Sequence, residues 1–305
     1  MARPLRPVPE ANRIPLDMLG FWLMLGFSVL LAFNNLAMKY GVQGFQPVVL
    51  AGLRSGIAVV ALTLWMRWRG IAFRFDLWWP GLLVGACFAF EFFLLFIAMD
   101  TTTLVRAAIL FYAMPLWTAA IGHFLFPGER LTPVRLAGFL LGFLAVALTL
   151  AAQAGGGMGA VAGGSLAGDL AALAAGFFWT LIVVVVRKTP IAETLPETQL
   201  FWQLLVSAVL LIALAPLYGG AWFRAVDGLQ IANLIFQALG IACFAFVLFF
   251  WLLRRYPAGT VASFSFVTPV LSVGLGWAVL GEEVSAVIPV AVLLLAGGLW
   301  LINRK

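Results

Sequence analysis

Two residues of opposite charge lie inside long apolar stretches, where a charge is costly and most often faces a cavity. Arg54 falls in the stretch from about 45 to 67, and Glu91 in the stretch from about 77 to 98. As membrane helices rising ~1.5 Å per residue, these stretches would hold both charges at similar depths of roughly 10 to 14 Å. Arg54 suits a substrate carboxylate, and Glu91 suits an ammonium or a proton. The alternative is a salt bridge that only fixes helix packing.

Uncharged polar and aromatic residues in similar stretches are further candidates for a binding site. We expect Asn34 and Gln203 to face a shared cavity, because Gln203 holds nearly the place in the second half of the chain that Arg54 holds in the first. Aromatic walls with a few polar groups suit a small organic ligand. Hydrogen bonds between helices and contact with lipid are the alternative roles. The candidate set is completed by Ser263, Ser265, Tyr112, Trp117 and Trp179.

Four residues in or near the fourth and ninth apolar stretches invite structural predictions. Arg106 and His123 lie toward opposite ends of their stretch, so we expect both at the membrane interface, with Arg106 extending its charge toward water. Pro115 and Pro269 lie in mid-stretch, where each removes a backbone hydrogen bond and favours a kink. We predict these two prolines to be hinges; the alternative is a pair of static kinks.

The overall composition indicates a membrane protein. Of 305 residues, 64% are hydrophobic and 10% are charged, against roughly 25% charged in soluble domains. The formal net charge of +6 does not indicate a nucleic-acid partner, because the basic residues lie in short loops between apolar stretches. One histidine and two separated cysteines predict neither a metal site nor a disulfide framework, and we expect no cofactor.

The apolar residues form ten stretches, each near the ~20 residues that cross a bilayer as a helix. Backbone groups in lipid must be paired within the segment, which favours helices. We therefore predict an all-α membrane protein with ten transmembrane helices, at approximately 18–40, 45–67, 77–98, 103–126, 132–151, 166–187, 196–218, 229–253, 259–280 and 285–303.

The distribution of cations predicts the orientation of these helices. Of the 18 Lys and Arg residues, all but four fall in loops on one side of the predicted membrane. Lys39 and Arg224 lie on the other side, and Arg54 and Arg106 lie within helices. Because cytoplasmic loops carry the excess of Lys and Arg, both termini are expected in the cytoplasm.

The two halves of the chain share an ordered set of features. The segment LVRAAILFYAMP ends at Pro115, and AGTVASFSFVTP ends at Pro269. Each is followed by an apolar run and a Gly-Glu pair, Gly128-Glu129 or Gly281-Glu282. We predict two five-helix repeats, residues 1–153 and 169–305, joined by a Gly-rich linker at 154–168. Five is odd, so the repeats would be inverted, as in many transporters. The alternative is chance similarity between apolar helices.

These features resemble the drug/metabolite transporter superfamily in its EamA-domain branch, with the YddG-like amino-acid exporters as the most similar group. The stretch LRRYPAGT at 253–260, followed by Val267, Thr268 and Pro269, carries the resemblance best. It implies a secondary transporter with a central cavity, which exports small metabolites, foremost amino acids, by alternating access. The implied location is a bacterial inner membrane, and the implied partners are the substrate and the lipid bilayer.

Other functions remain open at this point. One is a carrier of another small metabolite or of a drug. Another is an integral-membrane enzyme, although the only adjacent acidic pair is Glu282-Glu283, in a tight turn. We expect no enzymatic activity, and the sequence leaves the oligomeric state open, a monomer included.

Overall fold

The structure, a computed structural model, describes residues 16–126, 132–154, 164–256, 264 and 267–303. Within these residues the regular secondary structure is helical, apart from one isolated antiparallel bridge between Phe45 and Phe223. Eight helical segments are long and apolar enough to cross a membrane, and two shorter apolar helices join them. The predicted all-α fold with ten apolar helical segments is confirmed.

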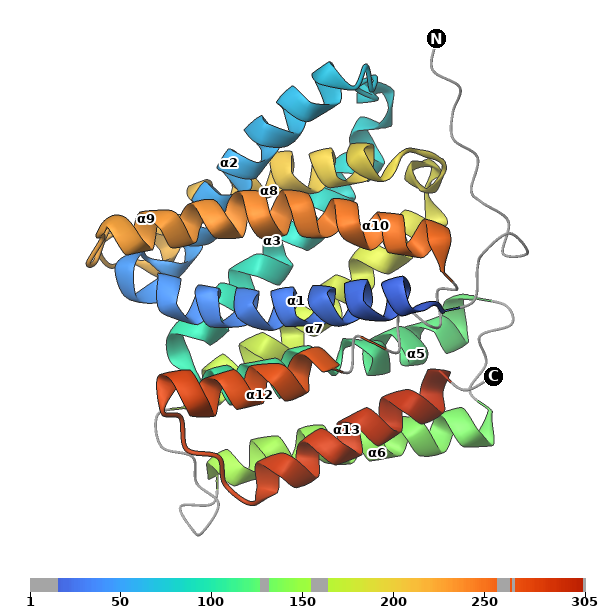
Figure 1. Cartoon of the computed structure of the whole chain (residues 1–305), viewed down its shortest axis with the longest axis vertical. Coiled ribbons are helices and arrows are strands. Elements are labelled where there is room, and N and C mark those ends of the chain that lie inside the picture. Colours follow the sequence, from blue (N-terminus) through green and yellow to red (C-terminus); the bar gives the residue numbers. More distant parts are fainter. Residues whose placement is uncertain (1–15, 127–131, 155–163, 257–263, 265–266, 304–305) are drawn as a thin grey trace.

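The helices follow the apolar stretches of the sequence (Figure 1). Polar side chains mark several starts, since Asp17 accepts the amide of Gly20 at 2.7 Å and Ser165 accepts that of Gly168 at 3.0 Å. In chain order the elements are α1 (Met18–Gly44), α2 (Pro47–Trp68), η2 (Phe75–Leu77), α3 (Trp78–Thr101), α4 (Leu104–Phe111), α5 (Met114–Leu125), α6 (Pro133–Ala154), α7 (Leu166–Lys188), η3 (Pro190–Glu193), α8 (Pro196–Tyr218), α9 (Gly228–Ile235), η4 (Phe236–Ala245), α10 (Phe246–Arg255), α12 (Val267–Leu280) and α13 (Val287–Asn303).

The fourth apolar segment is broken into two helices, α4 and α5, at Tyr112 and Ala113. The amide of Ala113 donates to the carbonyl of Leu110 at 3.3 Å, a tighter turn than in an α-helix. Pro115 is the second residue of α5, where its missing N–H needs no partner. Pro115 therefore lies directly after a two-residue interruption of the segment in which a kink was predicted, and its role as a hinge stays a prediction. Pro269 lies in the first turn of α12.

The eighth apolar segment runs through α9, η4 and α10 without a loop. Its middle part, η4, is a π-helix of ten residues. Such wide turns are rare and often lie next to functional sites. No pattern in the sequence predicts this segment, since the apolar residues continue evenly through it.

Helices from the two halves of the chain pair with each other throughout the bundle. α1 packs on α12, α2 on α8, α3 on α7 and α8, and α6 on α13. Figure 1 shows α6 and α13 side by side at one edge of the molecule. A Cβ atom on Gly138 or Gly298 would lie 2.5 Å from the backbone oxygen of the other, so this last contact requires both glycines.

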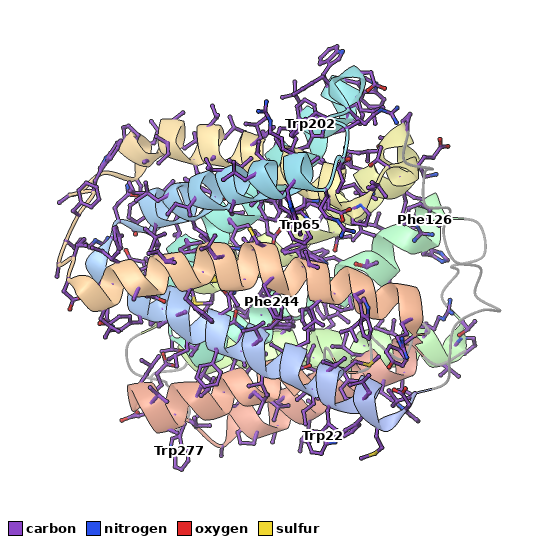
Figure 2. All side chains as sticks on the ribbon, turned by 45° about the horizontal axis from the view of Figure 1, so that its top comes forward. Trp22, Trp65, Phe126, Trp202, Phe244 and Trp277 are labelled. Atoms are coloured by element: carbon purple, nitrogen blue, oxygen red, sulfur yellow. The ribbon has the colours of Figure 1, made fainter. Side chains whose placement is uncertain are left out.

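The outer surface of the bundle is apolar and suits a lipid environment. Trp22 and Trp277 are exposed on it, and Figure 2 shows both at the edge of the molecule. Trp78 and Trp79, at the start of α3, are also exposed, as expected for residues at a membrane interface. The polar residues that matter for function must therefore be sought inside the bundle.

Candidate binding cavity

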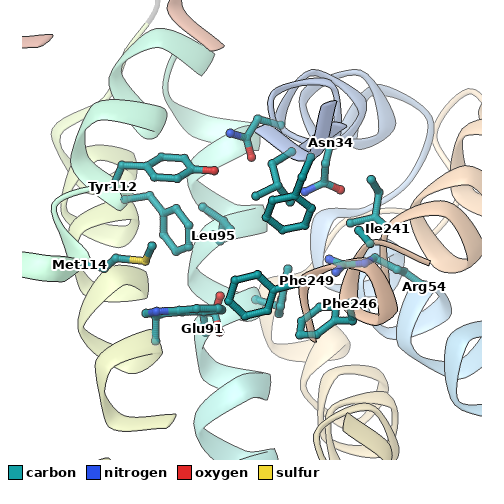
Figure 3. Close-up of a pocket in the computed structure, with 16 residues that line it drawn as sticks. Asn34, Arg54, Glu91, Leu95, Tyr112, Met114, Ile241, Phe246 and Phe249 are labelled. Atoms are coloured by element: carbon teal, nitrogen blue, oxygen red, sulfur yellow. The ribbon is translucent and has the colours of Figure 1, made fainter. Parts of the chain in front are cut away.

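A cavity of about 160 Å³ lies near the middle of the bundle (Figure 3). Helices of both halves contribute to it, from α1, α2 and α3 to α7, η4 and α10. Five residues predicted from the sequence to form a binding site line this cavity: Asn34, Arg54, Glu91, Tyr112 and Trp179. Residues that lie far apart in the sequence therefore converge on one internal space of the kind that holds small ligands.

Among the described residues that line the cavity, Arg54 is the only basic one. Its side chain is 3% exposed, and the guanidinium carbon lies 4.1 Å from the centroid of the Phe92 ring. This cation–π contact stabilises the buried charge without neutralising it. The Nε atom has no hydrogen-bond partner, so the guanidinium keeps an unused donor in the interior.

Glu91 and Asn34 bring unpaired acceptors to the same cavity. Oε2 of Glu91 and Oδ1 of Asn34 are both buried without a hydrogen-bond partner. Orphan buried polar atoms are uncommon in folded proteins and call for an explanation such as a bound group. Together with Nε of Arg54, the residues that line the cavity therefore hold one unsatisfied donor and two unsatisfied acceptors.

The salt bridge between Arg54 and Glu91, one of the two readings of the sequence, is absent from this structure. Figure 3 shows the two side chains well apart, with the rings of Phe246 and Phe249 between them in that view. Ion pairs in the described part of the chain lie elsewhere, at Arg74–Asp76, Arg106–Asp169 and Arg224–Asp100. The charges of Arg54 and Glu91 remain separate and are free to meet different parts of one ligand.

Aromatic and aliphatic side chains form the rest of the wall. Phe27 and Phe249 stack with centroids 5.6 Å apart, which joins α1 to α10 along the cavity. Trp179 of α7 and Phe111 at the end of α4 also line it. Such a wall suits an apolar or planar side chain, while the polar atoms fix the orientation of a ligand.

The family of the chain follows from comparison with known proteins. The profile of the EamA-like transporter family matches residues 18–151 and 166–304. The chain belongs to this family. This EamA-like protein is therefore a multi-pass membrane transporter and not an enzyme, in agreement with both expectations.

Two relatives and one solved structure illustrate the similarity. The uncharacterised transporter YvbV of Bacillus subtilis is 26% identical over 299 residues, which cover 93% of this chain and 91% of YvbV. The aromatic amino acid exporter YddG of Ancylobacter novellus is 29% identical over 180 residues, 54% of this chain and 58% of that protein. One crystal structure, with 24% identity and a TM-score of 0.60, matches in fold over 91% of this chain and 94% of its own.

Two other predicted site residues of the transporter do not line the cavity, and two more lie outside the described residues. Trp117 packs edge-on against Phe177 at 5.5 Å, and Gln203 is buried in α8 outside the lining. Ser263 and Ser265 lie outside the described residues. Sequence position along a helix gives the depth of a side chain but not its direction, which explains the two misplaced predictions.

Arg106 was predicted to reach the membrane interface, and the structure corrects this. Its side chain is fully buried and forms an ion pair with Asp169 of α7. Nε of Arg106 donates to both carboxylate oxygens at 3.1 and 3.0 Å, and the hydroxyl of Thr102 donates to the same carboxylate at 2.6 Å. The transporter thus fixes α4 against α7 through a buried charge pair. His123, predicted at the interface, is partly exposed in the last turn of α5.

Sequence reasoning also missed Asn35, whose side-chain amide donates to the Ser272 hydroxyl at 3.0 Å and whose residue lines the cavity. Its position next to Asn34 was the available signal. Asp169 was overlooked as well, although an acidic residue in an apolar stretch predicts a buried partner. Within the described residues, no group of three His, Cys, Asp or Glu side chains is arranged to hold a metal ion.

Proposed function

We propose that this transporter exports small zwitterionic metabolites, foremost amino acids, across the inner membrane of a bacterium by alternating access. The observation that carries the proposal is the set of orphan polar atoms in the cavity, a donor on Arg54 and acceptors on Glu91 and Asn34. A carboxylate would accept from the guanidinium, and an ammonium would donate to the two oxygens. The YddG relative, named an aromatic amino acid exporter, supports the same substrate class.

The proposal includes an orientation and a gating element. Both termini lie in the cytoplasm, supported by the one-sided distribution of cations in the loops. The break between α4 and α5 at Tyr112 and Ala113 adjoins the cavity, since Tyr112 and Met114 line it. Bending at this break, beside Pro115 and with Pro269 as its counterpart, would let each side of the cavity open in turn.

Counterflow of radiolabelled amino acids in proteoliposomes tests the function. Arg54→Gln and Glu91→Gln remove the two charges, while Arg74→Gln is the control, because Arg74 is exposed and pairs with Asp76 outside the bundle. We expect the first two variants to lose at least about tenfold in uptake, as a charge-assisted hydrogen bond contributes ~1.5–3 kcal/mol. Uptake by folded Arg54→Gln protein equal to that of Arg74→Gln would contradict the proposal.

A further inference from the structure

Two charged side chains hold the corner between α3 and α4, which comprises Met99–Val105. The carboxylate of Glu282 accepts the amide of Leu104 at 2.7 Å and the amide of Val105 at 2.9 Å. The ammonium of Lys39 donates to the carbonyls of Met99 at 2.7 Å and Thr102 at 2.6 Å. An anion thus meets the amino end of α4 and a cation meets the carboxyl end of α3, the arrangement that helix ends favour.

The Gly-Glu pair that ends α12 explains how Glu282 reaches this corner. Gly281 has a φ of +65°, which a glycine adopts without strain, and it turns the chain at the end of α12. The amide of Glu282 then donates back to the carbonyl of Gly276 at 3.0 Å. Gly281 thus ends α12, and the side chain of Glu282 contacts the amino end of α4.

Helix α4 connects the corner to the cavity. All eight residues of α4 are buried, and α4 runs from the corner to Phe111, which lines the cavity. In α5, the other half of the same apolar segment, only Leu116 and Gly122 are buried. Burial is therefore complete along α4, the helix between the corner and the cavity, and partial along α5.

The contact with Glu282 lies at a seam between two sets of helices. On one side of it, α4 is fixed to α7 by Arg106, Thr102 and the buried carboxylate of Asp169. On the other side, Glu282 follows α12, which packs on α1, the helix that carries Lys39. The carboxylate of Glu282 crosses this seam through two hydrogen bonds to backbone amides, beside the two hydrogen bonds from Lys39 and the packing of α12 on α4.

We infer that Glu282 is a latch that keeps the corner end of the cavity closed, and that its release from the amides of Leu104 and Val105 opens that end. The inference rests on the proposed alternating-access transport. In the proposed orientation the corner faces away from the cytoplasm, so the latch closes the exit. Glu283, the next residue, is exposed and has the same charge, which makes it a matched control.

Thiol labelling tests the latch without any substrate. Leu31→Cys places a reporter in the cavity wall, after Cys87 and Cys243 have been replaced by alanine. A membrane-impermeant maleimide is added to right-side-out or to inside-out vesicles. We expect Glu282→Gln to raise labelling from the corner side at least tenfold, while Glu283→Gln leaves it unchanged. Equal labelling rates in the two variants would overturn the latch.

A second variant disturbs the same contact without removing a charge. A methyl group on Gly276 would lie 3.0 Å from Oε2 of Glu282 and 2.8 Å from Cγ2 of Val105, so Gly276→Ala crowds the contact between Glu282 and α4. It should raise labelling from the corner side as Glu282→Gln does, and unchanged labelling in folded Gly276→Ala protein would also overturn the inference. Because labelling needs no substrate, a negative labelling result would refute the latch alone. The proposed transport function is tested separately by the assay of Arg54→Gln. If the Glu282→Gln variant were labelled faster from the side predicted to be cytoplasmic, the proposed orientation would be refuted. The latch itself would still be supported.

Discussion

At the scale of single residues, the chain contains two kinds of buried charge. Arg106 and Asp169 neutralise each other and are fully buried, so their role is to hold α4 on α7. Arg54 and Glu91 are also buried, but each has an unpaired polar atom, and both residues line a cavity. Two charges that pair with each other hold helices together, whereas two separate charges that line one cavity are available to a ligand.

The buried pair makes a prediction about stability. Asp169→Asn leaves the Arg106 charge buried without a counter-charge, so we expect it to lower the free energy of unfolding by ~3–5 kcal/mol. Asp76→Asn breaks an exposed pair with Arg74 and should cost at most ~1 kcal/mol. Thermal unfolding of the purified protein in detergent measures both. Equal melting temperatures for the two variants would show that the Arg106–Asp169 pair is not structural.

The sequence predicts the residues of the cavity only in part, for a physical reason. Arg54 and Glu91 could be recognised because a charge in lipid has few tolerable positions. Arg106 was misjudged because its partner Asp169 is 63 residues away, and no local pattern joins them. Gln203 and Trp117 lie outside the lining of this cavity, and apolar stretches of even composition do not reveal which face of a helix meets a cavity.

At the scale of helical elements, long apolar runs determine where the membrane helices lie. Local changes in backbone hydrogen bonding determine where these helices are interrupted. Pro115 marks the break between α4 and α5, although the sequence suggests a kink where the structure has a new helix. The π-helix η4 has no such marker, yet its residues Ile241 and Ala245 line the cavity. The sequence therefore predicts the positions of whole helical segments. It does not predict where the backbone hydrogen-bond pattern changes within a segment.

The break at Pro115 leads to a prediction about transport kinetics. Pro115→Ala restores a backbone N–H and favours a continuous helix through Tyr112 and Ala113, which stiffens the proposed hinge. We expect a several-fold slower exchange rate in proteoliposomes with nearly unchanged equilibrium binding of substrate. Pro133→Ala is the control, since Pro133 begins α6 at an exposed position. A hinge role would be excluded if Pro115→Ala exchanged substrate as fast as Pro133→Ala.

At the scale of the whole molecule, helices of both halves surround one cavity that presents a donor and acceptors between aromatic walls. The composition and the ten apolar stretches predict this class of fold because a chain so poor in charge can fold only in lipid. The lining of the cavity follows from helix packing, and no local pattern in the sequence reveals which helix faces pack together.

The orientation of the molecule is open to a direct test. Ala221→Cys lies in the exposed loop after α8, and Ala192→Cys lies exposed in η3, in the loop before it. We expect an impermeant thiol reagent added to intact cells, with the outer membrane permeabilised, to label position 221 and not position 192. The reverse pattern would place both termini outside the cytoplasm.

The central claim is that one cavity binds the carboxylate and the ammonium of the same ligand through Arg54, Glu91 and Asn34. It is tested most directly by equilibrium binding of three compounds to the purified wild-type transporter: an aromatic amino acid, its decarboxylated amine, and the acid that lacks the amino group. The account predicts that the amine and the acid each bind at least about tenfold more weakly than the amino acid. It is contradicted if either compound binds as tightly as the amino acid.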